Sequence, residues 1–335
     1  PSLSLFTYRR IRSLYYSSIN KSLNPIADYP IYEDKNVAHE IFIEYQSLKN
    51  EYKSFIGWRP LKTKKKHTNI IGKYHTRKSE GEEINNSIWF FGGSTMWGTG
   101  VSDSDTIPSI FNKISGQKVM NFGQLSWTSR QSLAQLITLL GDGLNPSKVI
   151  FYDGINDVNI GCRTEIKEVS VHARENVIKN SLKDNLFLKI SKDIKYPIDK
   201  LIQKFRNSRY AYDCDFNEYK VNKIADHLIN NWYTAYLILK AKNINFYAIL
   251  QPSIFTSEAP YDYFSKKEIN LLNNKRKQFN AVNRMILKKI KLKCKQDKSF
   301  CYSIIDGQDW IKTKSNIFQD FSHLSSEGNL IIARK

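Results

Sequence analysis

An α/β pattern begins at residues 87–95, which read SIWFFGGST. The short apolar run is followed by two glycines and a serine, which is typical of a buried parallel strand that ends in a tight turn. We therefore expect a strand over residues 87–91 that leads into a reactive turn at Ser94.

The alternation of strand and helix patterns continues to the C-terminus. Apolar runs predict further strands at residues 118–122, 149–152, 244–250 and 302–305. Helical spacing of apolar residues predicts helices over about 129–140, 219–241, 266–293 and 325–335. This order predicts a flavodoxin-like three-layer α/β/α sandwich with a five-stranded parallel sheet, whose ligand crevice lies beyond the carboxyl ends of the strands.

Two regions of the chain do not follow this pattern. Residues 1–85 have mixed helical and irregular signals and a basic run at 62–66, and we expect them to be an N-terminal extension packed on the catalytic domain. Residues 86–335 form the predicted α/β domain, with an insertion at about 162–215 that lacks a clear period and is expected to be a lid or side wall.

The formal net charge of +19 raises the question of a polyanionic partner. The lysines are spread along the chain, so no nucleic-acid partner is expected, and the charge is kept as a hint of an anionic glycan or an anionic membrane surface. No apolar stretch approaches the roughly 18–20 residues that span a bilayer. Since the sequence begins at Pro1, a signal or membrane anchor ahead of it is retained as an expectation.

Four cysteines are present, which permits three disulfide connectivities. We favour Cys162 with Cys214, which would close the insertion, and Cys294 with Cys301, which would close a short helix-to-strand connection. Such bridges would indicate an oxidising compartment, whereas four free thiols in a cytosolic protein are the alternative.

Chemistry-bearing residues follow the predicted strands and precede the last helix. Ser94 follows the first strand, Gly123 the second and Asn156 the third, while Asp320 and His323 stand in the final loop. A serine hydroxyl becomes a nucleophile when a histidine accepts its proton and a carboxylate orients that histidine. The backbone N–H groups of Ser94 and Gly123, with the Asn156 amide, could then stabilise the oxyanion of a tetrahedral intermediate.

The ordered blocks GGST, NFG, DGIND and DFSH resemble those of the SGNH, or GDSL-like, hydrolase superfamily over residues 87–335. The resemblance implies a metal-free site with Ser94 as nucleophile, His323 as base, Asp320 as its orienter, and Gly123 with Asn156 in the oxyanion hole. The family's Gly-Asp-Ser stands here as Gly92-Gly93-Ser94. The form of the blocks resembles a bacterial branch that carries an N-terminal extension and is associated with the cell envelope; a cytoplasmic location is the alternative.

Simpler interpretations exist for these residues. Ser94 could be a helix cap, and Asn156 with the next residue could form a turn. The glycine-rich segment lacks the ending of a phosphate-binding loop, and the other histidines lack metal-ligand spacing, so no cofactor or metal is expected. Trp97 and Trp127 could stack on a sugar, and Arg130 and Gln251 could line the pocket, although large aromatics are more often core.

The predicted function is removal of a small acyl group, acetyl, from a carbohydrate hydroxyl through an acyl-Ser94 intermediate. An O-acyltransferase would use the same groups with a glycan hydroxyl in place of water. A glycan-binding or assembly protein on the same fold is a third, non-catalytic alternative. The sequence specifies neither the glycan nor the oligomeric state.

Overall fold

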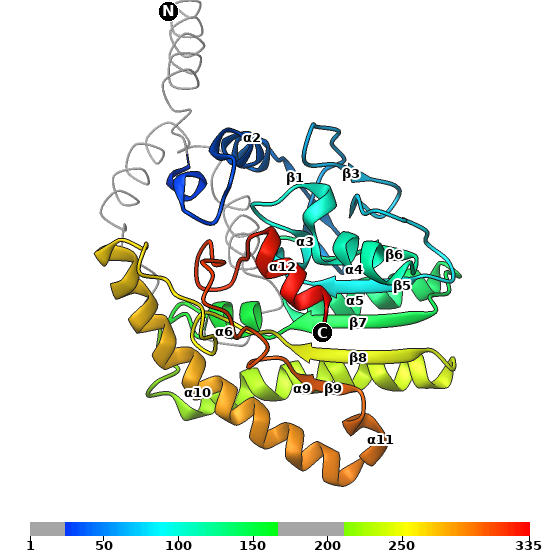
Figure 1. The fold of residues 1–335 in the computed structure, drawn as a ribbon. Helices are drawn as coiled ribbons and strands as arrows, with labels where there is room; N and C mark the ends of the chain where they lie inside the picture. The colour runs from blue at the N-terminus through cyan, green and yellow to red at the C-terminus, as the bar shows by residue number, and fades with distance from the viewer. Residues whose placement is uncertain (1–23, 167–210) are drawn as a thin grey trace, which may run out of the picture.

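The computed structural model describes residues 24–166 and 211–335. Its central sheet has the strand order β3-β4-β6-β5-β7-β8-β9 (Figure 1). The parallel strands are β5 (Ile88–Gly92), β6 (Val119–Asn121), β7 (Lys148–Asp153), β8 (Asn245–Leu250) and β9 (Ile304–Asp306). Each matches a predicted strand. Along the sheet they follow the order 2-1-3-4-5, a doubly wound arrangement that also occurs in flavodoxin.

The prediction of a wholly parallel, five-stranded sheet was wrong in one respect. The sheet has seven strands, because β3 (Ile70–Ile71) and β4 (Thr76–Arg77) extend it beyond β6. Both pairings are antiparallel, with Arg77 of β4 opposite Asn121 of β6. Two-residue strands are too short to give a periodic signal in sequence, which is why they were missed. Part of the extension is therefore built into the sheet.

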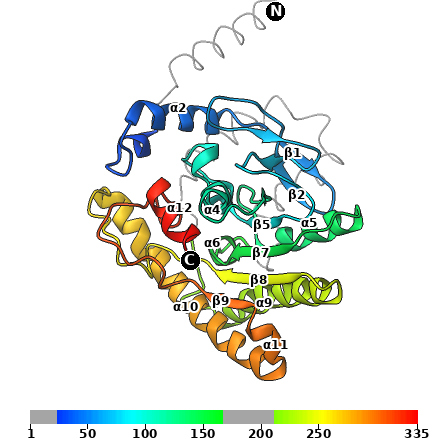
Figure 2. The same cartoon turned by 45° about the vertical axis from the view of Figure 1, so that its right-hand side comes forward.

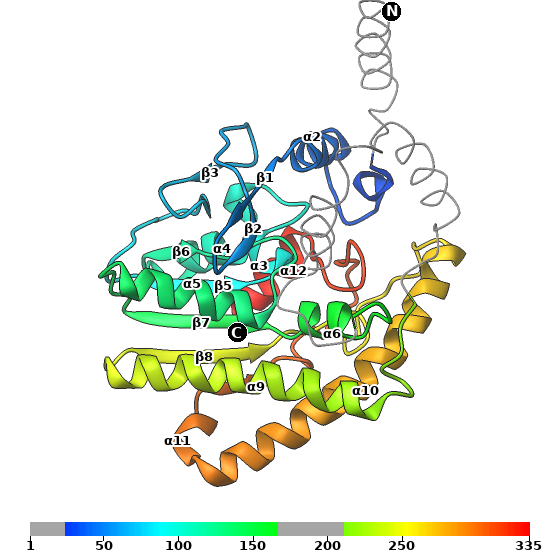
Figure 3. The same cartoon turned by 180° about the vertical axis from the view of Figure 1, so that it is seen from behind.

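Helices cover both faces of the sheet, and the alternation along β5 shows why. Trp89 and Phe91 pack toward α5 (Ser129–Gly141) and α9 (Glu218–Ala241). Ile88 and Phe90 pack toward α4 (Ile107–Ser115) and α12 (Ser326–Ala333). The rear view shows α5 and α9 together on one face (Figure 3), and the turned view shows α4 and α12 on the other (Figure 2).

The remaining helices lie at the edges of this core. The long α10 (Lys266–Gln296) packs along α9, and α11 (Lys298–Cys301) follows it. The short helices α3 (Ser94–Trp97), η2 (Asp103–Asp105) and α6 (Ile155–Gly161) lie in connections that follow strands. Within the described ranges, none of the helices is both long enough and apolar enough to span a membrane.

The described part of the extension also contacts the loops near the strand ends. It contains η1 (Pro25–Asp28), α2 (Lys35–Gln46) and an antiparallel hairpin of β1 (Asn50–Lys53) with β2 (Gly57–Pro60). The Trp127 indole N–H donates to the Trp58 carbonyl at 2.7 Å, and the Tyr32 hydroxyl donates to the Gly100 carbonyl at 3.0 Å. The extension is thus held against the segments that follow β5 and β6.

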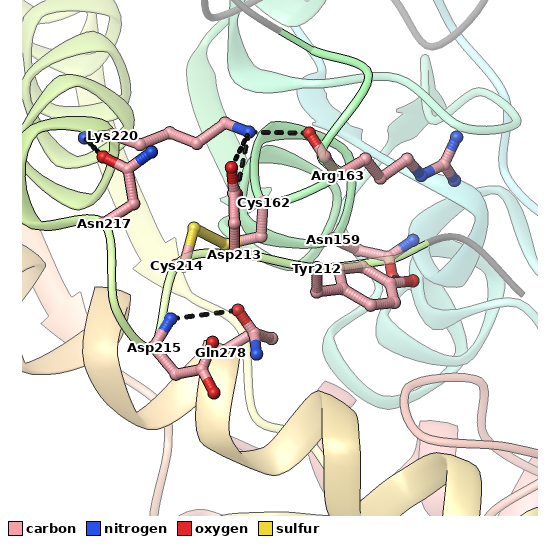
Figure 4. The surroundings of a disulfide bond; sticks show 10 residues. All are labelled: Asn159, Cys162, Arg163, Tyr212, Asp213, Cys214, Asp215, Asn217, Lys220 and Gln278. Carbon is pink, nitrogen blue, oxygen red and sulfur yellow. Dashed lines mark hydrogen bonds and ion pairs between the residues drawn. A yellow bond between two sulfur atoms is a disulfide. The ribbon is translucent and has the colours of Figure 1, made fainter.

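Both predicted disulfides are confirmed. Cys162 is bonded to Cys214 and Cys294 to Cys301. Around the first bridge, the Lys220 ammonium donates to Asp213 at 2.8 Å and to the Arg163 carbonyl at 2.6 Å (Figure 4). The bridge joins the two ends of the predicted insertion, of which residues 167–210 lie outside the described residues. Two disulfides are typical of an extracytoplasmic protein.

Candidate active site

The turn after β5 places Ser94 at the start of α3. Gly92 has φ +157°, and a Cβ there would lie 2.5 Å from the Tyr152 carbonyl oxygen. A Cβ on Gly93 would lie 2.3 Å from the Asn156 amide nitrogen. Gly92 therefore requires glycine, because a Cβ would meet fixed backbone, whereas a side chain at Gly93 would displace the Asn156 amide. This close approach leaves Ser94 half-buried, with its backbone N–H among the unpaired donors of the helix N-terminus.

The structure brings Ser94, His323 and Asp320 together in one chain of hydrogen bonds. The Ser94 Oγ and His323 Nε2 atoms are 2.7 Å apart. On the other side of the ring, His323 Nδ1 lies 2.8 Å from Asp320 Oδ2. Two positions separated by 229 residues along the chain thus meet in the arrangement that activates a serine hydroxyl.

The Asp320 carboxylate is held in its ionised form. Its Oδ1 atom accepts the backbone N–H groups of Ser322 at 2.8 Å and of His323 at 2.9 Å. Burial by itself would raise the pKa of Asp320, but the attraction of His323 and these hydrogen bonds outweigh it and hold the pKa well below its usual value. An ionised Asp320 keeps the proton of neutral His323 on Nδ1, so that Nε2 faces Ser94 as an acceptor.

Two buried glutamines fasten the loop of His323 to the segment that follows Ser94. Gln251 donates to the Thr95 hydroxyl at 2.9 Å, and that hydroxyl donates to the Ser322 carbonyl at 3.3 Å. Gln319 donates to the Thr99 carbonyl at 2.8 Å and to the Leu324 carbonyl at 2.7 Å. The prediction that Gln251 lines the pocket was wrong, because its side chain is buried and used to hold these two segments together.

The predicted oxyanion donors have different surroundings. Asn156, near the start of α6, donates through Nδ2 to the Trp127 carbonyl at 2.8 Å, which leaves the second hydrogen of that amide for another acceptor. The Gly123 N–H donates to Asn121 Oδ1 at 2.9 Å, so it would have to leave this acceptor to stabilise an oxyanion, and its predicted role stays a prediction. A Cβ on Gly123 would lie 2.6 Å from the backbone nitrogen of Trp97, and this close packing against α3 explains why the position is a glycine.

Ser126, in the same loop, was missed by the sequence analysis. It has φ +60°, a left-handed conformation that is uncommon for a residue with a side chain. It is exposed, and its N–H has no hydrogen-bond acceptor among the described residues. It directly precedes Trp127, whose carbonyl binds Asn156. The sequence could not predict this conformation, because serine is not a residue type that favours a positive φ.

The aromatic candidates for sugar contact are buried. Trp97 is 1% exposed, and the Arg77 guanidinium lies 4.2 Å from the centre of its ring. Trp127 is also 1% exposed and is fixed by its bond to Trp58. The prediction that these rings stack on substrate was therefore wrong, and both belong to the core. Arg130 is exposed on α5 and donates to Asn231 at 3.5 Å, so its contact with substrate stays a prediction.

A pair of buried carboxyl groups lies where β7 leads into α6. Asp153 ends β7 and Asp157 lies in α6, and Asp157 accepts the Ser129 hydroxyl at 2.6 Å. Burial, with the negative charge of Asp157, raises the pKa of Asp153 to about 8, and burial raises that of Asp157 as well. Asp153 is therefore mostly protonated below that pH, and its oxygens accept hydrogen bonds from Ser132 and Trp232. Among the described residues, no group of three or more His, Cys, Asp or Glu side chains is placed to hold a metal ion.

Comparison with known proteins finds similarity only at the level of structure. No protein-family model matches the sequence, and no curated protein is similar to it. Similar solved structures include a protein assigned to the lipolytic G-D-S-L family from Desulfitobacterium hafniense, with 12% identity, TM-score 0.38 and coverage of 75% of this chain and 97% of that one. A GDSL-like lipase from Bacteroides thetaiotaomicron has 14% identity, TM-score 0.34 and coverage of 74% and 84%. An acetyl xylan esterase has 12% identity, TM-score 0.31 and coverage of 74% and 96%. These similarities are too weak to assign an activity, which has to be inferred from the arrangement of Ser94, His323 and Asp320.

Proposed function

We propose that this protein is a serine esterase that removes a small acyl group, acetyl, from a carbohydrate hydroxyl through an acyl-Ser94 intermediate. The observation that carries the proposal is the pair of contacts made by the His323 ring, 2.7 Å to Ser94 Oγ and 2.8 Å to Asp320 Oδ2. An isolated helix-capping serine would need neither contact, whereas a nucleophilic serine needs both.

Acylation begins when Ser94 Oγ attacks the ester carbonyl carbon and His323 Nε2 takes the hydroxyl proton. The carbonyl oxygen becomes an oxyanion, and its charge is met by the Ser94 N–H and the free Asn156 amide hydrogen, with the Gly123 N–H as the third predicted donor. When the tetrahedral intermediate collapses, the bond to the sugar oxygen breaks and His323 gives its proton to that oxygen. The sugar leaves with a free hydroxyl, and the acyl group stays on Ser94.

Deacylation repeats these steps with water. His323 takes a proton from water as the water oxygen attacks the acyl carbon, and the same donors stabilise the second oxyanion. The Ser94–acyl bond then breaks, and the proton returns from His323 to Ser94 Oγ. Asp320 stays ionised throughout, because two backbone N–H groups and the His323 ring stabilise its charge.

The carbohydrate and envelope parts of the proposal rest on other observations. The blocks around Ser94, Asn156 and His323 resemble an envelope-associated branch of SGNH hydrolases. Two disulfides fit a compartment outside the cytoplasm, where surface polysaccharides are found.

The test is hydrolysis of 4-nitrophenyl acetate together with a panel of O-acetylated sugars, with released acetate as the readout. Wild-type protein should release acetate, and Ser94→Ala should not. Ser54→Ala is the matched control, because Ser54 is exposed in the turn between β1 and β2 and should leave the rate unchanged. Acetate release by Ser94→Ala at the wild-type rate would remove Ser94 from its role. Acetyl transfer to an added glycan in place of release would convert the proposal to an acyltransferase.

A further inference from the structure

A half-buried cation lies near the proposed active site and forms no ion pair with the carboxylates of residues 24–166 and 211–335. The Lys275 ammonium, on α10, donates to Asn159 Oδ1 at 3.0 Å and lies 3.6 Å from the centre of the Phe321 ring. None of the described carboxylates forms an ion pair with it, although other lysines of the chain are paired in this way. Removing a cation from water without an opposing charge is costly, so its presence calls for an explanation.

The two contacts of Lys275 place it between the parts of the structure that carry the proposed chemistry. Asn159 lies three residues after Asn156 in α6, which puts the two amides on one face of that helix. Phe321 lies between Asp320 and His323 in the catalytic loop. The ammonium thus bridges the helix of an oxyanion donor and the loop of the base.

Neighbouring groups hold this position and do not neutralise it. The Tyr212 hydroxyl also donates to Asn159 Oδ1, at 3.1 Å, so the amide oxygen is fixed by two donors. Figure 4 shows Tyr212 beside Asn159, two residues before Cys214, which is bonded to Cys162 at the end of α6. Asp320 attracts Lys275 from beyond ion-pair distance, but the Asp320 oxygens are already occupied by His323 and backbone N–H groups.

The charge of Lys275 lacks a close partner among the described residues. Burial lowers the pKa of Lys275 to about 8, Asp320 opposes this change, and the positive charge of Arg163 adds to it. An anion beside the Lys275 ammonium would provide the close opposite charge that none of the described carboxylates provides.

We infer that Lys275 binds an anionic group carried by the substrate, so that the ester substrate is an acylated acidic sugar bearing a carboxylate or a phosphate. This inference rests on the proposed function for its ester chemistry. Lys275 is here a specificity residue. The ammonium has N–H donors beyond the one given to Asn159, and these would hold the anion while the ester lies over Ser94.

Binding to the full chain tests the inference without requiring turnover. Isothermal titration calorimetry with glucuronate, glucose 6-phosphate and glucose should show that at least one of the two anions binds about tenfold or more tighter than glucose. Which anion shows the preference distinguishes carboxylate from phosphate. Lys275→Met should abolish the preference and Lys275→Arg should keep most of it. Lys277→Met is the matched control, because Lys277 is exposed on the same helix, and it should bind as wild type does.

Equal affinity of wild type for the anions and for glucose, or no binding of either anion, would overturn the inference. So would an anion preference that persists in Lys275→Met. The proposed function is judged separately, by acetate release from 4-nitrophenyl acetate: if wild type hydrolyses that ester but shows no anion preference, only this inference fails. If anion binding depends on Lys275 but no ester is hydrolysed, the proposed function fails, and of this inference only the anion-binding role of Lys275 stands.

Discussion

Replacement of Arg77 by methionine tests how strongly the extension supports the turn that carries Ser94. The Arg77 side chain is fully buried and forms an ion pair with Asp103. It also donates to the carbonyls of Val101 at 2.9 Å, His67 at 3.2 Å and Gly98 at 3.5 Å. Gly98 directly follows α3, so one guanidinium from β4 fixes the path of the chain immediately after the nucleophile.

The expected loss of stability is set by the groups that the substitution leaves unpaired. Methionine retains much of the packing against Trp97 but provides no donor. Among the described residues, the Asp103 carboxylate would then keep the bonds from Asn69, at 3.1 Å and 2.6 Å. Breaking a buried ion pair in this way costs about 3–5 kcal/mol, because the remaining charge stays desolvated. We expect Arg77→Met to lower the free energy of unfolding by about that amount, and to lower kcat more than KM because the Ser94 turn loosens.

Urea unfolding at pH 7, followed by tryptophan fluorescence, measures this change. Arg284→Met is the control, since Arg284 is exposed and bonds only the Asn280 carbonyl of its own helix; its effect should stay within about 0.5 kcal/mol. In the double variant Arg77→Met/Asp103→Asn, the loss should be smaller than the sum of the single losses, because no unpaired charge remains. A loss below about 1 kcal/mol for Arg77→Met would refute the reasoning.

Three further predictions concern the site and its supports. Asp320→Asn should lower kcat for acetyl-ester hydrolysis by about 10³–10⁴-fold with an unchanged circular-dichroism spectrum, because the His323 tautomer is no longer held; a loss below tenfold would contradict this. Because the pKa of Asp153 is raised to about 8 in the folded state, the folded protein holds a proton that the unfolded chain releases between about pH 4 and 8. Ionisation of Asp153 therefore lowers the free energy of unfolding by up to about 1.4 kcal/mol for each pH unit that the pH rises across that window. Above the window this contribution no longer changes with pH. In urea titrations, the free energy of unfolding of Asp153→Asn minus that of wild type should be larger at pH 8 than at pH 5. A difference that does not change with pH would argue against a raised pKa. Replacing Cys162 and Cys214 by serine should cost about 2–5 kcal/mol in urea unfolding, and an unchanged midpoint would show that the bridge does not constrain the chain.

The five parallel strands and the residues of the proposed triad were accessible from sequence for a simple physical reason. Buried parallel strands are continuous apolar runs, and their carboxyl ends meet at one edge of the sheet. Ser94 follows one such run, and the loop of His323 precedes a predicted helix, so their meeting is a consequence of topology. The structure places them 2.7 Å apart.

Features decided by tertiary contacts were not accessible. Gly123 stands after a strand, as a donor would, but the Asn121 side chain takes its N–H. Ser126 adopts a positive φ that residue type disfavours. The sequence leaves Trp97 as core, the commoner case, or as a sugar platform, and its 1% exposure with the Arg77 guanidinium against its ring decides for core. The strand β4 is too short for any period, and the sheet edge at β6 determines its conformation.

The central claim is that Ser94 is activated by His323. Labelling with a fluorophosphonate probe, followed by peptide mass spectrometry, tests it most directly, since the probe reacts with an activated serine hydroxyl. The account predicts a single modified residue, Ser94, in wild type, and labelling at least about 10³-fold slower in His323→Ala. Modification of a different serine, or equal labelling of Ser94 with and without His323, would contradict it.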